Sequence, residues 1–294
     1  MEEKIVKLGV VGLGRGLLMA CEALLNKNVK LCAVCDNNKI RLTDARKTLE
    51  KDKKIKDVLY FEEFSKMLEA DIDAVIVATD ATKHTSFSIE AIKAGKHVLS
   101  EIPTVDSLDD AKKLRETVRE NPDIKYMVGE NCCFWAFIEA WKKMYEENEF
   151  GEIVYAESEY LHSKQKNEYE KPSDPKHWRV IYPAIKYLTH NLGPLLYIMN
   201  DRVVSVTCIE SDIKYNPYRK GPATGAALFK TAKGAIIRIL ICFGAYVGFD
   251  HKFRLIGTKG TIETDNTKAY NVSHSFARLS DIPESLKDRV MVEL

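Results

Sequence analysis

Short apolar runs alternate with amphipathic stretches along the first 130 residues of the chain. One apolar run ends at Val11 and passes through three glycines into an apolar-rich stretch over 17–25, and a second run ends at Asp36. Further strand patterns lie at 57–60, 72–79, 96–100 and 125–129, and helical patterns lie between them at 39–51, 61–68, 84–94 and 108–119. Strands that alternate with helices in this way predict a parallel sheet.

The pattern changes after about residue 129. A helical pattern over 136–146 is followed by longer strand patterns at 153–162, 203–210, 226–231, 235–242 and 251–256. Glycine-containing turns at 232–234 and 257–260 join successive strands, which predicts antiparallel pairing. We therefore predict an α/β protein with a doubly wound parallel sheet over 1–128 and an α+β domain with an open, mainly antiparallel sheet over 129–294.

The turn over 12–16 carries the first candidate chemistry. Its glycines permit a tight bend and let backbone N–H groups approach a pyrophosphate at the start of the next helix, as in Rossmann-type domains. Asp36 follows Gly12 by twenty-four positions, where an acid that binds a ribose belongs. The third glycine comes early, at Gly16, and Leu17 holds its expected place. The candidate cofactor residues here are Gly12, Leu13, Gly14, Arg15, Gly16, Asp36 and Asn37.

Asp36 also decides which cofactor is expected. A carboxylate repels the 2′-phosphate of NADP, so this position favours NAD. The alternative is that Asp36 only caps the next helix, in competition with Asn37 and Asn38.

Composition narrows the classes of partner. The 294 residues are 45% hydrophobic and 30% charged, with a formal net charge of +1, which favours neither nucleic acid nor an anionic membrane surface. No run approaches the roughly 18 apolar residues of a membrane span. Cys32 and Cys35 have C-x-x-C spacing, but an odd offset on a strand predicts opposite faces. We therefore expect no metal site, no redox pair among the seven cysteines, and a cytoplasmic location.

The segment over 91–103, A-I-K-A-G-K-H-V-L-S-E-I-P, together with the glycine turn, resembles the Gfo/Idh/MocA oxidoreductases. That family binds NAD or NADP and acts mainly on sugars and cyclitols. The resemblance implies that Thr79, Asp80, His84 and Glu101 lie near the cofactor, although Thr79 and Asp80 also suit helix capping. The family's E-K-P motif is E-I-P here, because Ile102 stands where the family has a lysine that contacts the reacting hydroxyl.

Two further segments resemble a narrower branch of that family, the NAD-dependent α-N-acetylgalactosaminidases. They are E-N-C-C-F over 130–134 and Y-L-T-H-N-L-G-P over 187–194, in which Phe134 and Leu188 replace a tyrosine and a proline. The resemblance implies that His190 and Tyr187 are catalytic together with Glu101, and that Asn131 faces the cofactor. His162, Trp178 and Arg179 are candidate sugar contacts, because an aromatic ring beside an arginine suits stacking and hydroxyl recognition.

Three functions remain open at this point. The first is an NAD-dependent oxidoreductase that transfers a hydride at a carbon of a sugar or sugar derivative. The second is a redox-neutral glycosidase in which oxidation is followed by elimination, water addition and re-reduction. The third is an NAD-binding sensor without catalysis, suggested by Ile102 and Phe134. We also expect a homo-oligomer formed through the exposed face of the C-terminal sheet.

Overall fold

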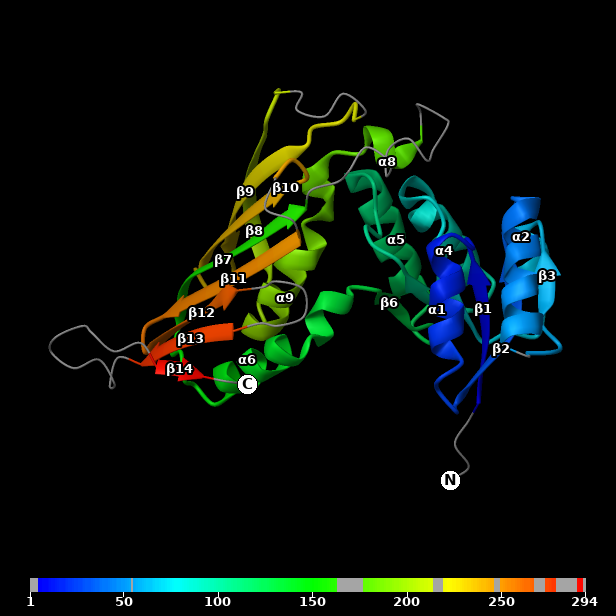
Figure 1. Cartoon of the computed structure of the whole chain (residues 1–294), viewed down its shortest axis with the longest axis horizontal. Coiled ribbons are helices and arrows are strands. Elements are labelled where there is room, and N and C mark those ends of the chain that lie inside the picture. Colours follow the sequence, from blue (N-terminus) through cyan, green and yellow to red (C-terminus); the bar gives the residue numbers. More distant parts are fainter. Residues whose placement is uncertain are drawn as a thin grey trace, which may run out of the picture. The chain divides into compact units, whose positions relative to one another are not determined.

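The computed structural model describes residues 5–53, 55–162, 177–213, 219–245, 249–266, 273–278 and 290–292. The chain divides into two compact units, Met1–Gly129 and Glu130–Leu294, and each unit contains its own sheet (Figure 1). In the described part of the chain, no helix combines the length and apolar character that a bilayer crossing needs.

The first unit contains a six-stranded sheet in which all neighbouring strands run parallel. The strand order is β3-β2-β1-β4-β5-β6. The strands are β1 (Val6–Val11), β2 (Val29–Cys35), β3 (Leu59–Phe61), β4 (Ala74–Val77), β5 (His97–Ser100) and β6 (Tyr126–Val128). The order reverses between β1 and β4, and in such sheets ligands bind where the two central strands end.

Helices cover both faces of this sheet, as a doubly wound fold requires. They are α1 (Arg15–Ala23), α2 (Lys39–Arg46), α3 (Phe64–Leu68), α4 (His84–Lys93) and α5 (Leu108–Glu120). Ala20 of α1 and Ala45 of α2 join one buried cluster, whereas Phe64 of α3, Ile92 of α4 and Leu114 of α5 join another. The predicted fold class of this half is confirmed.

Several element boundaries differ from the predicted ones. Phe61 belongs to β3, where it pairs with Cys35, so α3 begins three residues later than the helical pattern predicted. The helical pattern over 39–51 splits into α2 and a wider π-helical turn, Lys47–Asp52.

The prediction that Cys32 and Cys35 lie on opposite faces of their strand is wrong. A bulge interrupts the pairing of β1 with β2: Leu8 pairs with Leu31 and Gly9 with Ala33, so Cys32 is the extra residue. The bulge shifts the alternation of faces, and Cys32 packs against the same buried cluster that contains Cys35. Both thiols are free, and burial raises the pKa of Cys35 to about 12, which makes it a poor nucleophile.

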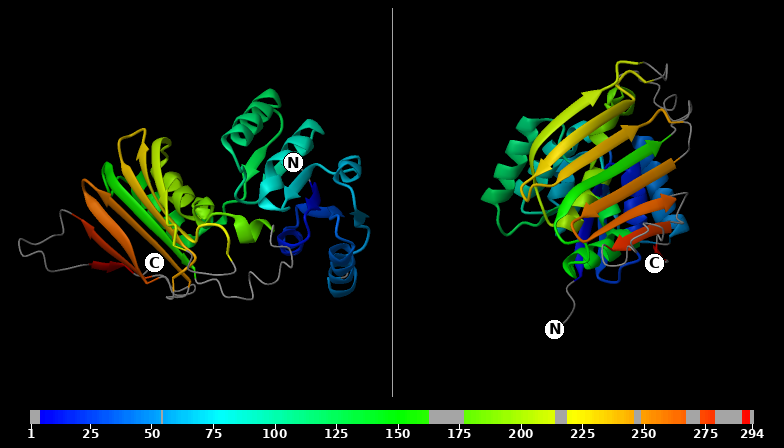
Figure 2. Two further views of the ribbon diagram at one scale, coloured as in Figure 1. Left: turned by 90° about the horizontal axis from the view of Figure 1, so that it is seen from above. Right: turned by 90° about the vertical axis from the view of Figure 1, so that its left-hand side faces the viewer.

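The second unit contains an eight-stranded sheet, which Figure 2 shows from two sides, in the order β14-β13-β12-β11-β7-β10-β9-β8. β7 and β10 pair in parallel and the other neighbours are antiparallel. The strands are β7 (Ile153–His162), β8 (Val203–Glu210), β9 (Thr224–Thr231), β10 (Ile236–Cys242), β11 (Phe249–Gly257), β12 (Gly260–Asn266), β13 (Ser273–Arg278) and β14 (Val290–Val292). The mainly antiparallel sheet is confirmed, and β12, β13 and β14 were not predicted.

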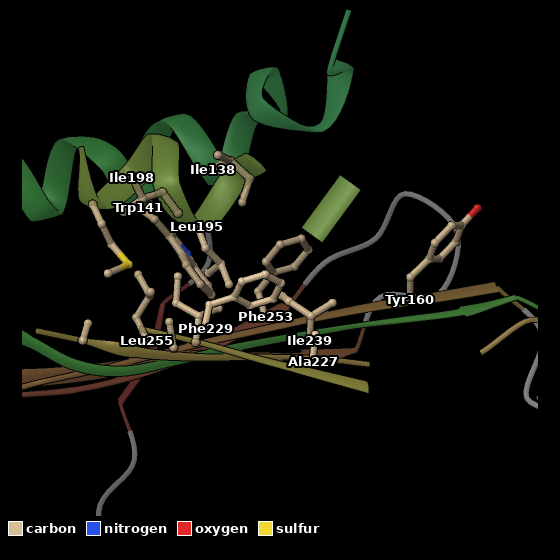
Figure 3. Close-up of a cluster of buried hydrophobic side chains, with 14 of the residues drawn as sticks. Ile138, Trp141, Tyr160, Leu195, Ile198, Ala227, Phe229, Ile239, Phe253 and Leu255 are labelled. Carbon is tan, nitrogen blue, oxygen red and sulfur yellow. The ribbon is translucent and has the colours of Figure 1, made fainter. Parts of the chain in front are cut away.

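Helices α6 (Ala136–Glu146) and α9 (Thr189–Met199) pack on one face of this sheet. Figure 3 shows Trp141 and Leu195 of these helices beside Phe229 and Phe253 of the strands, with Tyr160 at the end of the cluster. Short helices lead into this layer: η3 (Asn131–Phe134), α8 (Trp178–Ile181) and η4 (Ala184–Tyr187). This layer places residues 130–134 and 187–190 over the same end of the sheet core.

The other face of the sheet carries a row of paired charges that we call the charged ladder: Glu157, Glu159, Arg238, Arg254 and Glu263. Arg238 on β10 bonds Glu157 at 2.9 Å and Glu159 at 2.6 Å, both on β7. Arg254 on β11 bonds Glu157 at 2.6 Å and Glu263 of β12 at 2.5 Å. The ladder therefore links four neighbouring strands through side chains.

Candidate functional site

The glycine turn follows β1 at the point where the strand order reverses. Gly12 has φ +87°, and a Cβ atom there would lie 2.4 Å from the carbonyl oxygen of Ala78. Only glycine fits both the conformation and the close approach of the two chain segments.

The early glycine, Gly16, has a packing role. A Cβ atom at Gly16 would lie 3.0 Å from Val10 Cγ1 and 3.1 Å from the Cβ of Ala78, so the glycine lets α1 lie close to β1 and β4. Gly14 differs from both: the nearest atom to a Cβ there is 3.7 Å away, on Arg41. A Cβ atom at Gly14 would therefore meet the protein only at ordinary van der Waals distance, on the Arg41 side chain.

Asp36 is a buried carboxylate that links the end of β2 to the glycine turn. Its Oδ2 accepts a hydrogen bond from the N–H of Leu13 at 2.7 Å, and its Oδ1 accepts one from the N–H of Asn38 at 2.8 Å. The cap of α2 is Asn38, whose side chain accepts from the N–H groups of Ile40 and Arg41. Asp36 is therefore not the helix cap, and it lies beside the turn where a ribose-binding acid belongs.

A pocket beside this turn brings five of the predicted cofactor residues together. Its lining includes Gly12, Asp36, Asn37, Thr79 and Asp80. They come from the ends of β1, β2 and β4, which meet at one edge of the parallel sheet. This is the position at which open α/β sheets bind their ligands.

His84 ties two loops of the first unit together. Its Nε2 lies 3.0 Å from the carbonyl oxygen of Thr79, and its Nδ1 lies 2.9 Å from that of Pro103. Both ring nitrogens therefore face backbone acceptors, and the ring is buried. This geometry makes His84 a residue that positions the loop after β4.

Glu101 and Arg15 form a pair between the end of β5 and the start of α1. Arg15 Nε lies 3.4 Å from Glu101 Oε1, and Glu101 Oε2 accepts a hydrogen bond from the N–H of Ile102 at 3.0 Å. Ile102 is buried, at 8% exposure, so its position offers no polar side chain.

The second unit contains a hydrogen-bonded group of Glu130, Cys132 and His190. His190 Nδ1 donates to Glu130 Oε1 at 2.8 Å, and Cys132 Sγ lies 3.4 Å from the same ring nitrogen. The N–H of Cys132 also donates to Glu130 Oε1, at 3.0 Å. A carboxylate that holds Nδ1–H leaves Nε2 of a neutral imidazole as a proton acceptor.

Glu130 was not among the predicted site residues. Burial raises the pKa of its carboxyl group, but the hydrogen bond and charge of His190 and the donors of Cys132 outweigh burial and lower the pKa. Its Oε2 is buried without a hydrogen-bond partner among the described residues. The only sequence signal was its place at the head of the E-N-C-C-F segment.

These three residues also have the atom types and proximity of metal ligands. However, the 2.8 Å between His190 Nδ1 and Glu130 Oε1 is a hydrogen-bond distance, whereas two ligands of one tetrahedral zinc ion lie about 3.3 Å apart. Burial and the charge of Glu130 also raise the pKa of the Cys132 thiol, which disfavours the thiolate that a metal needs. The geometry therefore fits an acid–base pair better than a metal site.

Aromatic rings surround His190 on the sheet side. Tyr160 of β7 lies 5.9 Å from it, between ring centroids, and His251 of β11 lies 4.2 Å from Tyr160. His162, a predicted sugar contact, lies 5.7 Å from Tyr160. Tyr160 and His251 were missed, although His251 alternates along β11 with the buried Phe253 and Leu255, which marks it as facing the core.

Tyr187 and Arg179 complete this group. The rings of Tyr187 and His190 have their centroids 6.5 Å apart, since η4 runs into α9. Arg179 Nη1 donates to the hydroxyl of Tyr187 at 3.2 Å, and its guanidinium lies 4.3 Å over the ring of Trp178. Asn131 is exposed at the start of η3, next to Glu130. All the predicted site residues beyond 130 thus lie around one end of the second unit's helical layer.

Two family models match the chain, one for each unit. "Oxidoreductase family, NAD-binding Rossmann fold" of Gfo/Idh/MocA matches residues 6–130, and "GFO/IDH/MocA C-terminal domain" matches residues 138–263.

Curated bacterial proteins are among the relatives of this chain. Glycosyl hydrolase family 109 protein 2 of Phocaeicola vulgatus is 32% identical over 207 residues, which cover 67% of this chain and 50% of that protein. The α-N-acetylgalactosaminidase of Bacteroides fragilis is 30% identical over 207 residues, 67% of this chain and 48% of that protein. The chain spans about half the length of the curated relatives it matches.

Solved structures share the fold at lower identity. Scyllo-inositol dehydrogenase from Lactobacillus casei, with bound NAD(H) and scyllo-inositol, is 22% identical with a TM-score of 0.78, over 94% of this chain and 82% of that one. The WlbA dehydrogenase from Bordetella pertussis, in complex with NADH and UDP-GlcNAcA, is 23% identical with a TM-score of 0.77, over 90% of this chain and 74% of that one.

Proposed function

Because the chain belongs to the Gfo/Idh/MocA family of NAD-binding oxidoreductases, we propose that it is an NAD-dependent enzyme that acts on a CH–OH group of a sugar or sugar derivative. The names of its relatives support this substrate class, since they act on or bind inositols, nucleotide sugars and N-acetylgalactosaminides. The observation that carries the proposal is the hydrogen bond from His190 to Glu130.

The residues of the first unit fit NAD. A Cβ atom at Gly14 would approach no atom closer than 3.7 Å, and Asp36 at the end of β2 lines a pocket together with Gly12 and Thr79. Gly12, Gly14 and the N-terminus of α1 would hold the pyrophosphate, and Asp36 the adenosine ribose. When bound, NAD⁺ supplies a hydride acceptor.

His190 takes the role of general base. Glu130 fixes the ring through Nδ1, so Nε2 accepts the proton of a sugar hydroxyl as that carbon is oxidised. The carboxylate also stabilises the imidazolium that this proton transfer produces. The 19% exposure of the His190 side chain leaves the ring accessible to a small ligand.

Tyr187 and Arg179 hold the sugar in this proposal. The hydrogen bond between them fixes the direction of both polar groups. Trp178, stacked on Arg179, offers an apolar ring for the sugar face.

The second candidate is a redox-neutral glycosidase, and two observations favour it. Glycosyl hydrolase family 109 proteins are among the curated relatives, and Ile102 is buried where the family's E-K-P motif has lysine. In such a cycle a ketone at one sugar carbon makes the neighbouring C–H acidic, and the group at the anomeric carbon then leaves. The cycle needs a second acid/base group beside His190, and we propose Tyr187 for it, whose ring centroid lies 6.5 Å from that of His190.

The test compares two products in one assay. The protein with NAD is incubated with free sugars and with aryl glycosides, and NADH absorbance and aryl-group release are followed. Stoichiometric NADH from a sugar supports the oxidoreductase, and aryl release without net NADH supports the glycosidase.

His190→Ala distinguishes both enzymes from the sensor. We expect it to abolish turnover and to leave NAD affinity unchanged, with His97→Ala, a histidine on β5 bonded to the N–H of Lys125, as the control. Tight NAD binding with no turnover across the panel would instead support a sensor.

A further inference from the structure

Asn191, the residue after His190, carries a buried amide that reaches from α9 to the strand β7. Its Nδ2 donates a hydrogen bond to the hydroxyl of Ser158. Both residues are at 0% exposure, so no solvent competes for this contact. We call the hydrogen bond between Asn191 and Ser158 the α9–β7 tether.

Apolar side chains flank the tether in the sheet. Ser158 pairs with Ile239 of β10 and with Phe253 of β11, and both of these residues are buried. The Oδ1 atom of Asn191 is also buried, and it has no hydrogen-bond partner among the described residues. A buried amide that is only partly hydrogen-bonded costs stability, so the needs of the core do not explain why a polar pair lies here.

The turn of α9 that contains His190 lacks a backbone hydrogen bond of the regular helix. The carbonyl of residue 190 would accept from the N–H of residue 194, but Pro194 has no N–H. His190 is also the second residue of α9, and the first N–H groups of a helix have no partner within it. Side-chain contacts therefore contribute more than usual to the position of this turn.

Two side-chain contacts hold the turn from different sides. Glu130, at the start of η3, bonds the ring of His190, and the tether joins the next residue, Asn191, to β7. Gly193 permits the first contact, because a Cβ atom there would lie 3.0 Å from Cγ of Glu130. The turn is thus fixed both to the segment before α6 and to the sheet.

The tether also joins the two chain segments that carry the rings of His190 and Tyr160. Ser158 and Tyr160 are two residues apart on β7, so their side chains lie on the same face of the strand. Asn191 follows His190 directly on α9. The rings of His190 and Tyr160 meet edge to face, with their centroids 5.9 Å apart and their planes at 83°.

We infer that Asn191 and Ser158 are positioning residues, whose hydrogen bond fixes the ring of His190 against Tyr160 and so keeps Nε2 in the orientation that proton transfer requires. The catalytic part of this inference rests on the proposed function, in which His190 is the general base. Fixed geometry matters because a misplacement of about 1 Å can cost a reaction about a hundredfold.

The test replaces both partners by apolar side chains of similar size, in a double variant with Ser158→Ala and Asn191→Leu. Neither change leaves a buried partner unpaired, so we expect the midpoint of thermal unfolding to stay the same or to rise. The nuclear Overhauser effect between the ring protons of Tyr160 and His190 should weaken, measured on the ligand-free full chain with labelled histidine and tyrosine. His190→Ala assigns the signal.

Kinetics of the same double variant test the catalytic part. With a substrate that the wild-type protein turns over, we expect kcat to fall by about tenfold or more and KM to change by less than about threefold. Ser158→Ala alone makes the same test with a smaller change, and it should lower the unfolding midpoint because Asn191 is left unpaired.

Thr231→Val is the matched control. It removes another buried hydroxyl of the same sheet, which accepts the N–H of Ala235 at 3.0 Å. Thr231 ends β9 level with the start of β7 and not with Tyr160. We expect this variant to keep both the nuclear Overhauser effect and kcat.

The outcomes separate this inference from the proposed function. An unchanged nuclear Overhauser effect in the double variant overturns the inference, and so does an unchanged kcat. If the wild-type protein turns over no sugar or glycoside, the proposed function fails, while the spectra of the ligand-free protein still decide whether the tether fixes the ring. Equal losses in Thr231→Val would count against the inference, because they would show a general loosening of the sheet.

Discussion

At the scale of single residues, burial sets the protonation state of His251. The ring is 3% exposed, against Tyr160, Trp135 and Phe253. Burial, followed by the charges of His190 and His162, lowers its pKa from 6.5 to about 3. The ring is therefore neutral in the folded protein over most of the acidic range.

This shift predicts a pH dependence of stability. The unfolded chain takes up a proton on His251 below pH 6.5, whereas the folded chain does not until about pH 3, so the free energy of unfolding falls as the pH falls through this window. The loss from this group between pH 7.5 and 5.5 is about 1.4 kcal/mol. His251→Phe removes it, and chemical denaturation at both pH values measures the difference. If the free energy of unfolding changed by the same amount between the two pH values in both proteins, the result would contradict the lowered pKa of His251.

A second prediction at the scale of single residues concerns the carboxylate of Glu130. In the proposed enzyme, Glu130→Gln keeps the size of the side chain but loses the negative charge that holds His190, so we expect kcat to fall by about tenfold to a hundredfold with little change in KM. Glu139→Gln, which alters an exposed glutamate bonded to Tyr197 on the neighbouring helix, is the control. A change in KM alone would assign Glu130 to substrate binding.

At the scale of elements, the turn between β1 and α1 contains one glycine that the fold requires, Gly12, and one that we expect only ligand binding to require, Gly14. Gly12 is required by its φ angle and by the carbonyl of Ala78, whereas a methyl group at Gly14 meets no atom within 3.7 Å. Alanine substitutions at these two glycines, two positions apart, should therefore act on different properties.

We expect Gly12→Ala to lower the free energy of unfolding by at least about 2 kcal/mol, through strain at positive φ and the steric clash. Gly14→Ala should change it by less than about 0.5 kcal/mol but weaken NAD binding at least about tenfold, because the methyl group takes the place proposed for the pyrophosphate. Thermal unfolding without ligand and NAD titration measure the two effects. Full NAD affinity in a stable Gly14→Ala protein would contradict the proposed position of the pyrophosphate at this turn.

The elements also show what local patterns predict. Alternating strands and helices predicted the first sheet, because each strand of a parallel sheet is apolar throughout. β12 was missed because only Ile262 is a large apolar residue in it. The bulge at Cys32 was missed because it depends on the pairing of β2 with β1 and not on the sequence of β2.

The same reasoning applies to the site. His190 and Tyr187 were predicted because a sequence motif contains both. Glu130 and Tyr160 were not, since their proximity to His190 depends on strands and helices that meet only in the fold. A carboxylate indicates a functional site when it is buried, and the burial of a residue cannot be predicted from a short motif.

At the scale of the whole molecule, the sheet face that carries the charged ladder remains our candidate for an oligomer interface. Leu228, at 54% exposure, and Ile236, at 49%, share that face with Arg238 and its partners. Val206 on the adjacent strand pairs with the buried Phe229 and so points to the opposite face, where it is 55% exposed. The two exposed positions offer a comparison between the two faces.

We expect the wild-type protein to elute as an oligomer in size-exclusion chromatography with light scattering. Leu228→Glu should dissociate it by burying a charge in the interface, whereas Val206→Glu, the same type of change on the other face, should not. A monomeric wild-type protein would contradict the predicted oligomer. Dissociation by Val206→Glu alone would place the interface on the other face of the sheet.

The charged ladder also has a consequence for how the second unit reaches its structure. β7 and β10 must find each other in parallel across more than seventy intervening residues, and a slip by one residue would turn Arg238 toward the core face. A slip by two residues would keep the faces but move Arg238 away from its place between Glu157 and Glu159. Each wrong pairing thus leaves an arginine or a glutamate without its partner, so the ladder penalises misaligned intermediates and selects the native alignment of the central strands.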